Sequence, residues 1–197
     1  TALFNWLFAK QNNGKFLLRI EDTDLERSKK EYVDQITDAL KWLGLNWDED
    51  IILQSNNNNR HQEMVNKMLE NGTAYRCFLQ KDELDKLRKE SDKKKVIFRV
   101  PQTYRNLSSI EQKKLIDEGK SYTVRIKVPD GETEFNDMVY GSIKVQNKDL
   151  DDFIIARSDG SPTYNFVVAV DDADMNISHV IRGDDHLANT PKQILVY

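Results

Sequence analysis

The sequence predicts an α/β protein whose parallel sheet is interrupted by an inserted α+β domain, and three observations support this fold class. Helical and strand-like segments alternate over residues 1–77. The apolar run "KFLLRI" (15–20) is short and continuous, as strands buried in a parallel sheet are. After Gly119 the pattern changes to strands and turns typical of antiparallel pairs. We therefore expect residues 1–77 and 158–197 to form one domain around the insertion 78–157.

The first helix is expected over residues 1–11, and Gly14 follows it as a stop signal. Four apolar residues share one face of this helix: Leu3, Phe4, Leu7 and Phe8. After the first strand, a second helix carries apolar residues at helical spacing. Ser28 and Glu31 have the spacing of a capping box at its start, and Gly44 supplies a C-terminal stop.

The next segments predict a loop, a helix, a strand and a charged helix. "QSNNNNR" (54–60) predicts a loop in which an asparagine caps the helix "HQEMVNKMLENG" (61–72). "TAYRCFL" (73–79) predicts a second strand. The charge-dense run 80–95 predicts a helix with a solvated face.

The second half of the insertion is rich in strand signals. Ser108 and Glu111 form a capping box that opens another helix, and Gly119 ends it. Three runs then alternate as antiparallel strands do: "YTVRIKV", "TEFNDMVYGSIKVQN" and "DDFIIARSDG". Helical and strand-like runs resume after them: "TYNFVVAVDDAD", "ISHVIRG" and "NTPKQILVY".

The composition describes a polar globular chain of 197 residues, 39% hydrophobic and 31% charged. Its net charge of -4 gives no global positive field, so nucleic-acid binding requires a local basic patch. The single cysteine, Cys77, excludes an internal disulfide and a cysteine-based zinc site, and it fits a reducing cytosol. No apolar run is long enough for a membrane span, and no secretory signal is visible. The chain opens inside a helix, so we expect its true start upstream of Thr1.

Two segments mirror each other and carry the candidate chemistry. "FLLRIEDTD" is an apolar strand followed by acids, and "SHVIRGDDH" is an apolar strand followed by Arg182, a glycine and two acids. The carboxyl ends of parallel strands meet at one crevice of an open sheet. Carboxylates would face an amino group there and a guanidinium would face an acid, so the pair of segments predicts a site for a zwitterionic ligand.

Other interpretations of these residues stay open. Asp22 and Asp24 could cap the following helix or hold Mg²⁺, although no phosphate-binding glycine loop supports a metal. Asp184 or Asp185 could cap the last helix. Tyr164, in the segment "SDGSPTYNF", is either a pocket hydroxyl or a core aromatic.

The three histidines have no metal-ligand spacing, and packing or surface roles are expected for them: His61, His179 and His186. His186, beside a glycine, could also stack on a base.

The chain resembles bacterial glutamyl-tRNA synthetases over nearly its whole length. The segments that carry the resemblance include "ALFNWLFAK", "LLRIEDTDLERS", "ALKWLGLNWDED", "AYRCF", "RNLS", "VRIKVP" and "DDFIIARSDGSPTYNFVVAVDDADMNISHVIRGDDHLANTPKQ". The resemblance implies a class I synthetase with a Rossmann-like parallel sheet and helices on both faces. It also implies that the inserted α+β domain binds the acceptor end of tRNA.

The resemblance further implies an activity: ATP-dependent activation of L-glutamate and transfer of the glutamyl group to tRNA(Glu). ATP would enter with Mg²⁺ as a substrate complex, and zinc is not expected. A cytoplasmic, monomeric enzyme is implied.

The resemblance assigns roles to particular residues of this chain. Glutamate would be bound by Glu21, Tyr164, Asn165 and Arg182. ATP would lie near Asp185 and His186. The tRNA acceptor end would lie near Asp24 and Arg27.

Several features of the family pattern are absent from the sequence. The HIGH-like motif is expected upstream and the KMSKS-like loop downstream, so this chain is expected to be an inactive fragment. The link near residues 91–104 also departs from the family. Two alternatives stay open: a truncated paralogue that glutamylates a modified base of another tRNA, and a non-catalytic module of the same fold that binds RNA or a partner.

Overall fold

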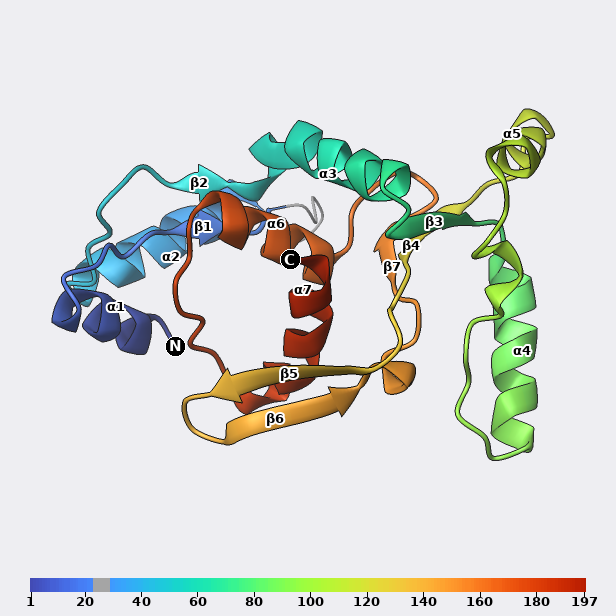
Figure 1. Ribbon diagram of the computed structural model, residues 1–197. Helices are drawn as coiled ribbons and strands as arrows, with labels where there is room; N and C mark the ends of the chain where they lie inside the picture. Colours follow the sequence, from blue (N-terminus) through green and yellow to red (C-terminus); the bar gives the residue numbers. More distant parts are fainter. Residues whose placement is uncertain (23–28) are drawn as a thin grey trace. The chain divides into compact units, whose positions relative to one another are not determined.

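The computed structural model describes residues 1–22 and 29–197, which divide into two compact units (Figure 1). Unit 1 comprises Thr1–Arg60 and Met175–Leu187. Unit 2 comprises His61–Asp174 and Ala188–Tyr197. The functional domains expected from the sequence follow a different partition of the chain, and their boundaries stay a prediction.

Unit 1 contains a pair of short parallel strands with helices before and after the first of them. Its elements are α1 (Ala2–Gln11), β1 (Arg19–Ile20), α2 (Lys30–Trp42), β2 (Ile52–Leu53) and the 3-10 helix η1 (Gln54–Asn57). β1 and β2 pair in parallel, with Arg19 opposite Ile52 and Ile20 opposite Leu53. The parallel strand predicted from "KFLLRI" is therefore confirmed, although only its last two residues form the ladder.

The ends of the unit 1 helices agree in part with the capping signals. Gly44, at φ +74°, ends α2 in a Schellman motif, because the Leu45 N–H reaches the Leu40 carbonyl and the Gly44 N–H reaches Lys41. At the start of α2 the N-cap position belongs to Lys29, which makes no side-chain cap. Ser28, the expected cap, lies outside the described residues.

The asparagine-rich segment forms helix rather than the expected loop. η1 leads directly into α3 (Asn58–Glu70). The prediction of a loop is wrong. The partly buried carboxylate of Asp22 accepts the backbone N–H of Ser55, and this hydrogen bond satisfies a donor at the start of η1. Local asparagine propensity for turns is overridden by this contact between distant parts of the chain.

The core of unit 2 lies between helices and a three-stranded antiparallel sheet. The sheet has the order β3 (Ala74–Cys77), β4 (Thr123–Ile126), β7 (Ile154–Ala156). Apolar residues of α3 and α6 (Tyr164–Asp174) pack against it, and the buried members include Val65, Ile126, Ile155, Phe166 and Val170. α7 (Thr190–Val196) adds Leu195 and Val196 to this cluster.

A second, smaller cluster lies where the chain leaves β3. Tyr75, Cys77 and Val100 are buried together, near α4 (Lys81–Lys93), η2 (Gln102–Tyr104) and α5 (Ser109–Asp117). The capping box at the start of α5 is confirmed: Glu111 N–H donates to Ser108 Oγ, and the Glu111 carboxylate accepts the Ser108 N–H. The Ser108 hydroxyl also donates to the Glu111 carboxylate at 2.6 Å, and this bond, together with the one from the Ser108 N–H, lowers the pKa of Glu111 below its ordinary value.

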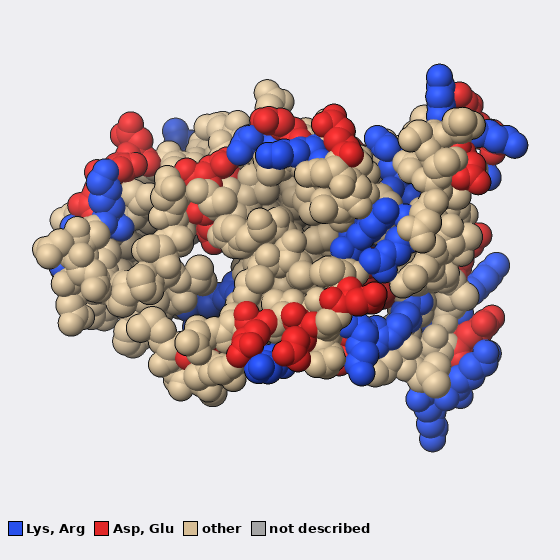
Figure 2. Space-filling view, in the orientation of Figure 1, with Lys and Arg blue, Asp and Glu red and all other residues tan. Residues whose placement is uncertain are grey.

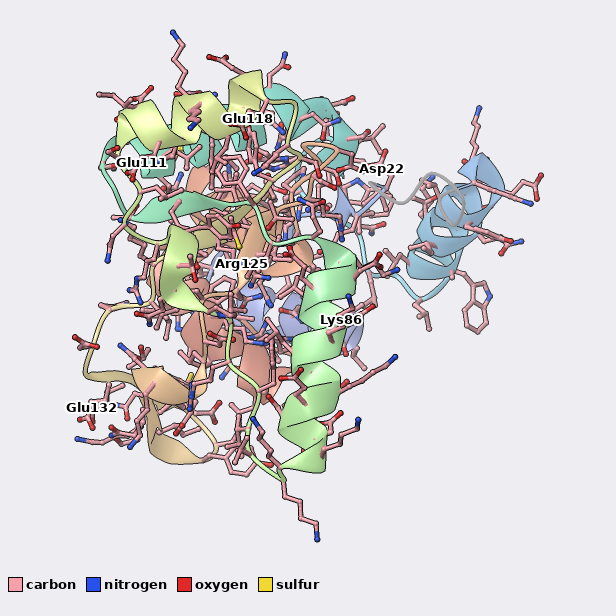
Figure 3. The ribbon with its side chains drawn as sticks, turned by 90° about the vertical axis from the view of Figure 1, so that its right-hand side faces the viewer. Asp22, Lys86, Glu111, Glu118, Arg125 and Glu132 are labelled. Carbon is pink, nitrogen blue, oxygen red and sulfur yellow. The ribbon has the colours of Figure 1, made fainter. Side chains whose placement is uncertain are left out.

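A buried polar network ties the sheet strands together. Arg125 donates to the Asp152 carbonyl at 2.6 Å, and Asp152 Oδ1 accepts the Val128 N–H. Arg105 lies 3.5 Å from the second Asp152 oxygen. Burial, with the nearby Asp152 charge, raises the pKa of the Tyr75 hydroxyl far above its ordinary range. Figure 3 shows Arg125 amid the elements of unit 2, whereas Glu111 and Glu132 lie at its periphery.

The remaining strands form a separate hairpin. β5 (Glu132–Asp137) and β6 (Gly141–Gln146) pair in antiparallel register, followed by η3 (Asn147–Asp149). Met138 and Val139 at its tip are almost fully exposed. On the face shown in Figure 2, acidic and basic side chains are interspersed, in keeping with the small net charge.

Candidate functional site

The acid-rich segment after β1 presents Glu21 at the surface of unit 1. The Glu21 side chain is 44% exposed, and its Oε1 lies 3.7 Å from Arg19 Nη2. The Arg19 side chain is only 13% exposed and also reaches the Met175 sulfur. A carboxylate held beside a largely buried guanidinium stays accessible to a cationic ligand while its position is restricted.

Asp22, the next residue, has a structural role that the sequence did not reveal. Its two oxygens accept the Ser55 N–H at 2.8 Å and the Ser55 hydroxyl at 2.7 Å. The contact joins the segment after β1 to the segment after β2, and Figure 3 shows Asp22 at this edge. Both Asp22 oxygens therefore accept hydrogen bonds inside the protein. Asp22 connects the segments after the two strands, a role different from the helix capping and Mg²⁺ binding considered for it above.

The second candidate segment, residues 178–182, is not the strand that the sequence predicted. It has no regular secondary structure, and Val180 is 57% exposed. A strand needs a neighbouring backbone, and here the Ile181 carbonyl accepts a hydrogen bond from the Asn5 side chain at 3.1 Å instead. The Phe8 and His179 rings also lie 4.7 Å apart, so α1 holds this segment at two points. Arg182 follows directly and is partly exposed.

Gly183, in "VIRGDDH", lies close to the exposed end of the Asp185 side chain. A Cβ at Gly183 would overlap the Asp185 carboxylate. The 3-10 helix η4 (Asp184–Asn189) follows, with Asp185 79% and His186 41% exposed. His186 Nε2 lies 3.7 Å from Asp185 Oδ2. The two residues expected near ATP are therefore adjacent and accessible.

The turn before α6 prepares the remaining candidates in unit 2. Asp159 Oδ1 accepts the Ser161 N–H at 2.8 Å and the Ser161 hydroxyl at 2.6 Å, which lowers the pKa of Asp159. Tyr164 begins α6 and is 44% exposed, so it is not a core aromatic. Asn165 Oδ1 accepts a hydrogen bond from Gln193 of α7 at 3.3 Å.

A buried histidine–aspartate pair fixes α6 against α3. His61 Nε2 lies 2.8 Å from Asp171 Oδ1, and both side chains are fully buried. The packing role expected for His61 is thus confirmed, but its aspartate partner was missed. No motif links residues 110 positions apart, so the sequence carries no signal for this pair.

The candidate residues therefore divide between the units. Unit 1 holds four of them, in two segments: Glu21, Arg182, Asp185 and His186. Unit 2 holds Tyr164 and Asn165 at the start of α6. Asp24 and Arg27, expected near the tRNA acceptor end, lie outside the described residues. One pocket built from all of these side chains stays a prediction.

The structure describes the ranges 1–22 and 29–197. Within them His, Cys, Asp and Glu side chains form no group of three that could hold a metal ion. Cys77 is fully buried in unit 2. Every helix in the same ranges is too short or too polar to cross a bilayer.

Paired parallel strands, with acids after the first and an accessible arginine and acids in a second loop of unit 1, define a Rossmann-like α/β protein. All 197 residues match the family model "tRNA synthetases class I (E and Q), catalytic domain". The chain belongs to this family.

The relatives and solved structures agree with this assignment. The chain is 54% identical to the glutamate–tRNA ligase of Aquifex aeolicus and 50% identical to glutamate–tRNA ligase 1 of Helicobacter hepaticus. Each match covers 100% of this chain and 42% of the relative. A crystal structure of a glutamate tRNA ligase from Elizabethkingia meningosepticum, in complex with its amino acid, superposes with a TM-score of 0.90 at 35% identity. That match covers all of this chain and 42% of the other.

Proposed function

We propose that the full-length protein is a glutamate–tRNA ligase, which activates L-glutamate with ATP and transfers it to the 3′ end of tRNA(Glu). The observation that carries the proposal is the match of the whole chain to ligases of this name at about half identity. The chain spans less than half the length of these relatives, so the activity belongs to the whole protein.

In the proposed reaction the α-carboxylate of glutamate attacks the α-phosphate of ATP, and pyrophosphate leaves with its Mg²⁺. The terminal ribose hydroxyl of tRNA then attacks the carbonyl carbon, and AMP leaves. Neither step needs a covalent enzyme intermediate, so catalysis depends on orientation and on stabilising charge at the phosphate.

The amino-acid pocket follows from the charges of the candidate residues. Glu21 would accept the ammonium group of the substrate, which the exposure of its carboxylate permits. Arg182 would form a fork with the side-chain carboxylate of glutamate, and Tyr164 and Asn165 would complete the polar wall. A neutral glutamine side chain would lose the charge-assisted pair with Arg182, which gives discrimination between the two amino acids.

The remaining roles concern ATP and tRNA. Asp185 and His186 lie together on an accessible turn and would flank ATP. Asp24 and Arg27 would face the acceptor end, and Arg27 could contact its phosphates. We place the enzyme in the cytoplasm as a monomer without zinc, in line with the single, buried cysteine.

The test is an ATP–pyrophosphate exchange and aminoacylation assay on the full-length protein, with glutamate, glutamine and aspartate compared in the presence of tRNA. In the presence of tRNA, we expect ATP–pyrophosphate exchange with glutamate but not with glutamine or aspartate, and we expect glutamyl-tRNA to form. A matched tRNA sample with its terminal ribose oxidised by periodate serves as the control.

Each other result points to a different protein. Equal glutamylation of the oxidised tRNA would assign the group to a base and favour the truncated paralogue. Binding of tRNA without exchange for any of the three amino acids would contradict an enzyme and favour a binding module.

A further inference from the structure

We propose that Asn5 is a positioning residue for Arg182, and that α1 thereby sets the affinity of the proposed site for glutamate. The inference rests on the proposed function for the identity of the substrate. The contact itself lies wholly within unit 1, because α1 and residues 175–187 both belong to that unit.

The inference rests on a hydrogen bond from the Asn5 side chain to a backbone carbonyl that has no strand partner. Asn5 Nδ2 donates to the Ile181 carbonyl at 3.1 Å, and the two residues are 176 positions apart. Ile181 is the residue immediately before Arg182. Since residues 178–182 have no regular structure, the hydrogen bond from Asn5 is a direct restraint on the peptide unit that carries the arginine.

Asn5 has a geometry that few side chains can reproduce. Its amide nitrogen also lies 3.3 Å from the Thr1 carbonyl, one turn earlier on the same helix. An amide has two N–H groups, so it can hold the helix and the loop at the same time. Aspartate has the same shape but no N–H group, and its oxygens would face both carbonyls.

A second contact on the same face of α1 supports this interpretation. Phe8, three residues after Asn5, places its ring 4.7 Å from the ring of His179. α1 therefore contacts the loop at His179 and at Ile181, the residue immediately before Arg182. A guanidinium fork needs an accurate position, because bidentate pairing depends on the alignment of two N–H groups with two oxygens.

The experiment compares Asn5→Ala and Asn5→Asp in the full-length protein with Asn12→Ala. Asn12 also lies at α1 and donates to a carbonyl, that of Phe8 at 2.8 Å, but its bond is local to the helix. ATP–pyrophosphate exchange gives KM for glutamate, KM for ATP and kcat. Amide hydrogen exchange over residues 178–182 measures the restraint without reference to activity.

Both Asn5 variants should raise KM for glutamate by about three- to tenfold, the range expected for one lost hydrogen bond, with KM for ATP unchanged. They should also speed hydrogen exchange over 178–182, and Asn12→Ala should do neither. A lower melting temperature with an unchanged KM for glutamate would show a merely structural role and overturn the proposal.

The assay separates this inference from the proposed function. If the wild-type protein fails to activate glutamate, the proposed function is wrong and the substrate named here falls with it. In the same samples, unchanged hydrogen exchange in Asn5→Ala would overturn the restraint itself, whatever the substrate.

Discussion

Asp22 accepts two hydrogen bonds from Ser55, one from the backbone N–H at 2.8 Å and one from the hydroxyl at 2.7 Å. These residues follow the two parallel strands of unit 1, so the contact closes the sheet at the edge where Glu21 lies. Hydrogen bonds to an ionised acceptor are stronger than neutral ones. The position of Glu21 therefore depends on its neighbour in the sequence.

Removal of this contact should destabilise the protein in two steps. Ser55→Ala deletes the hydroxyl bond and should lower the free energy of unfolding by about 1 kcal/mol, and Asp22→Ala deletes both bonds and should cost about 2–3 kcal/mol. Urea unfolding measures both values. Ser142→Ala is the control, because Ser142 makes the same kind of bond to Glu134 on an exposed hairpin, and a change below about 0.5 kcal/mol is expected there. Equal losses in all three variants would contradict the role of Asp22.

The buried hydrogen bond between His61 and Asp171 should contribute measurably to the free energy of unfolding. Replacement of either residue by alanine should cost about 1–3 kcal/mol, because the remaining buried side chain loses the 2.8 Å hydrogen bond between them. The double variant should lose less than the sum, with a coupling of about 0.5–3 kcal/mol. Lys67→Ala, on the exposed side of α3, should change stability by less than about 0.5 kcal/mol. Additive losses in the double-mutant cycle would show that the two side chains act independently.

Asp48 predicts part of the response of unit 1 to acid. The Phe16 N–H donates to Asp48 Oδ2 at 2.8 Å, Lys10 lies 3.0 Å from Oδ1, and these bonds lower the pKa of Asp48 below its ordinary value of 3.8. A lowered folded-state pKa contributes stability above pH 3.8, and this contribution is lost as the pH falls from 3.8 through the lowered value. Asp48→Asn should therefore flatten the acid limb of the stability curve.

The control for this pH prediction is Asp50→Asn, which removes a neighbouring charge of the same loop. Thermal unfolding followed from pH 6 to pH 2 (about the range in which carboxyl groups titrate) should show a change in slope for Asp48→Asn only. A parallel shift of the whole curve for Asp48→Asn, without a change in slope, would rule out a linked proton at this residue.

The proposed glutamate pocket predicts unequal effects on the two small substrates. In the full-length protein, Arg182→Ala should raise KM for glutamate at least about thirtyfold and KM for ATP little, because loss of a desolvated charge pair costs on the order of 2–5 kcal/mol. Arg182→Lys should recover only part of the affinity, since an ammonium cannot form the bidentate fork. Steady-state exchange kinetics give both constants.

Arg88→Ala is the matched control for Arg182, because Arg88 lies exposed on α4 beside Asp85. No change in either KM is expected for it. Equal increases for glutamate and ATP in Arg182→Ala would remove this residue from the amino-acid pocket.

The capping and turn signals of the sequence were reliable where they are local. The box of Ser108 and Glu111 and the stop at Gly44 form as expected, because each depends on backbone groups within one turn. The antiparallel strands of unit 2 and the α/β class were also predicted, since alternation and continuous apolar runs record which faces are buried.

The errors arose where a distant partner decides the local structure. The asparagine-rich segment is helical, and Asp22 accepts a backbone N–H at its start. Residues 178–182 do not form the predicted strand, and the Ile181 carbonyl instead accepts a hydrogen bond from Asn5. Neither partner can be inferred from spacing, because hydrogen bonds over 33 and 176 positions leave no periodic trace in the sequence.

By itself the sequence determined the fold class, the family resemblance and the identity of the charged residues that the proposed chemistry needs. Only the tertiary structure decided which of these charged side chains are hydrogen-bonded within the protein and which stay accessible to a ligand. Asp22 and Glu21 are adjacent acids, yet one is satisfied by Ser55 and the other is 44% exposed. The reason is that hydrogen-bond partners and burial are properties of the packed chain: both Asp22 oxygens are bonded to Ser55, whereas the Glu21 carboxylate lies beside Arg19 and stays accessible.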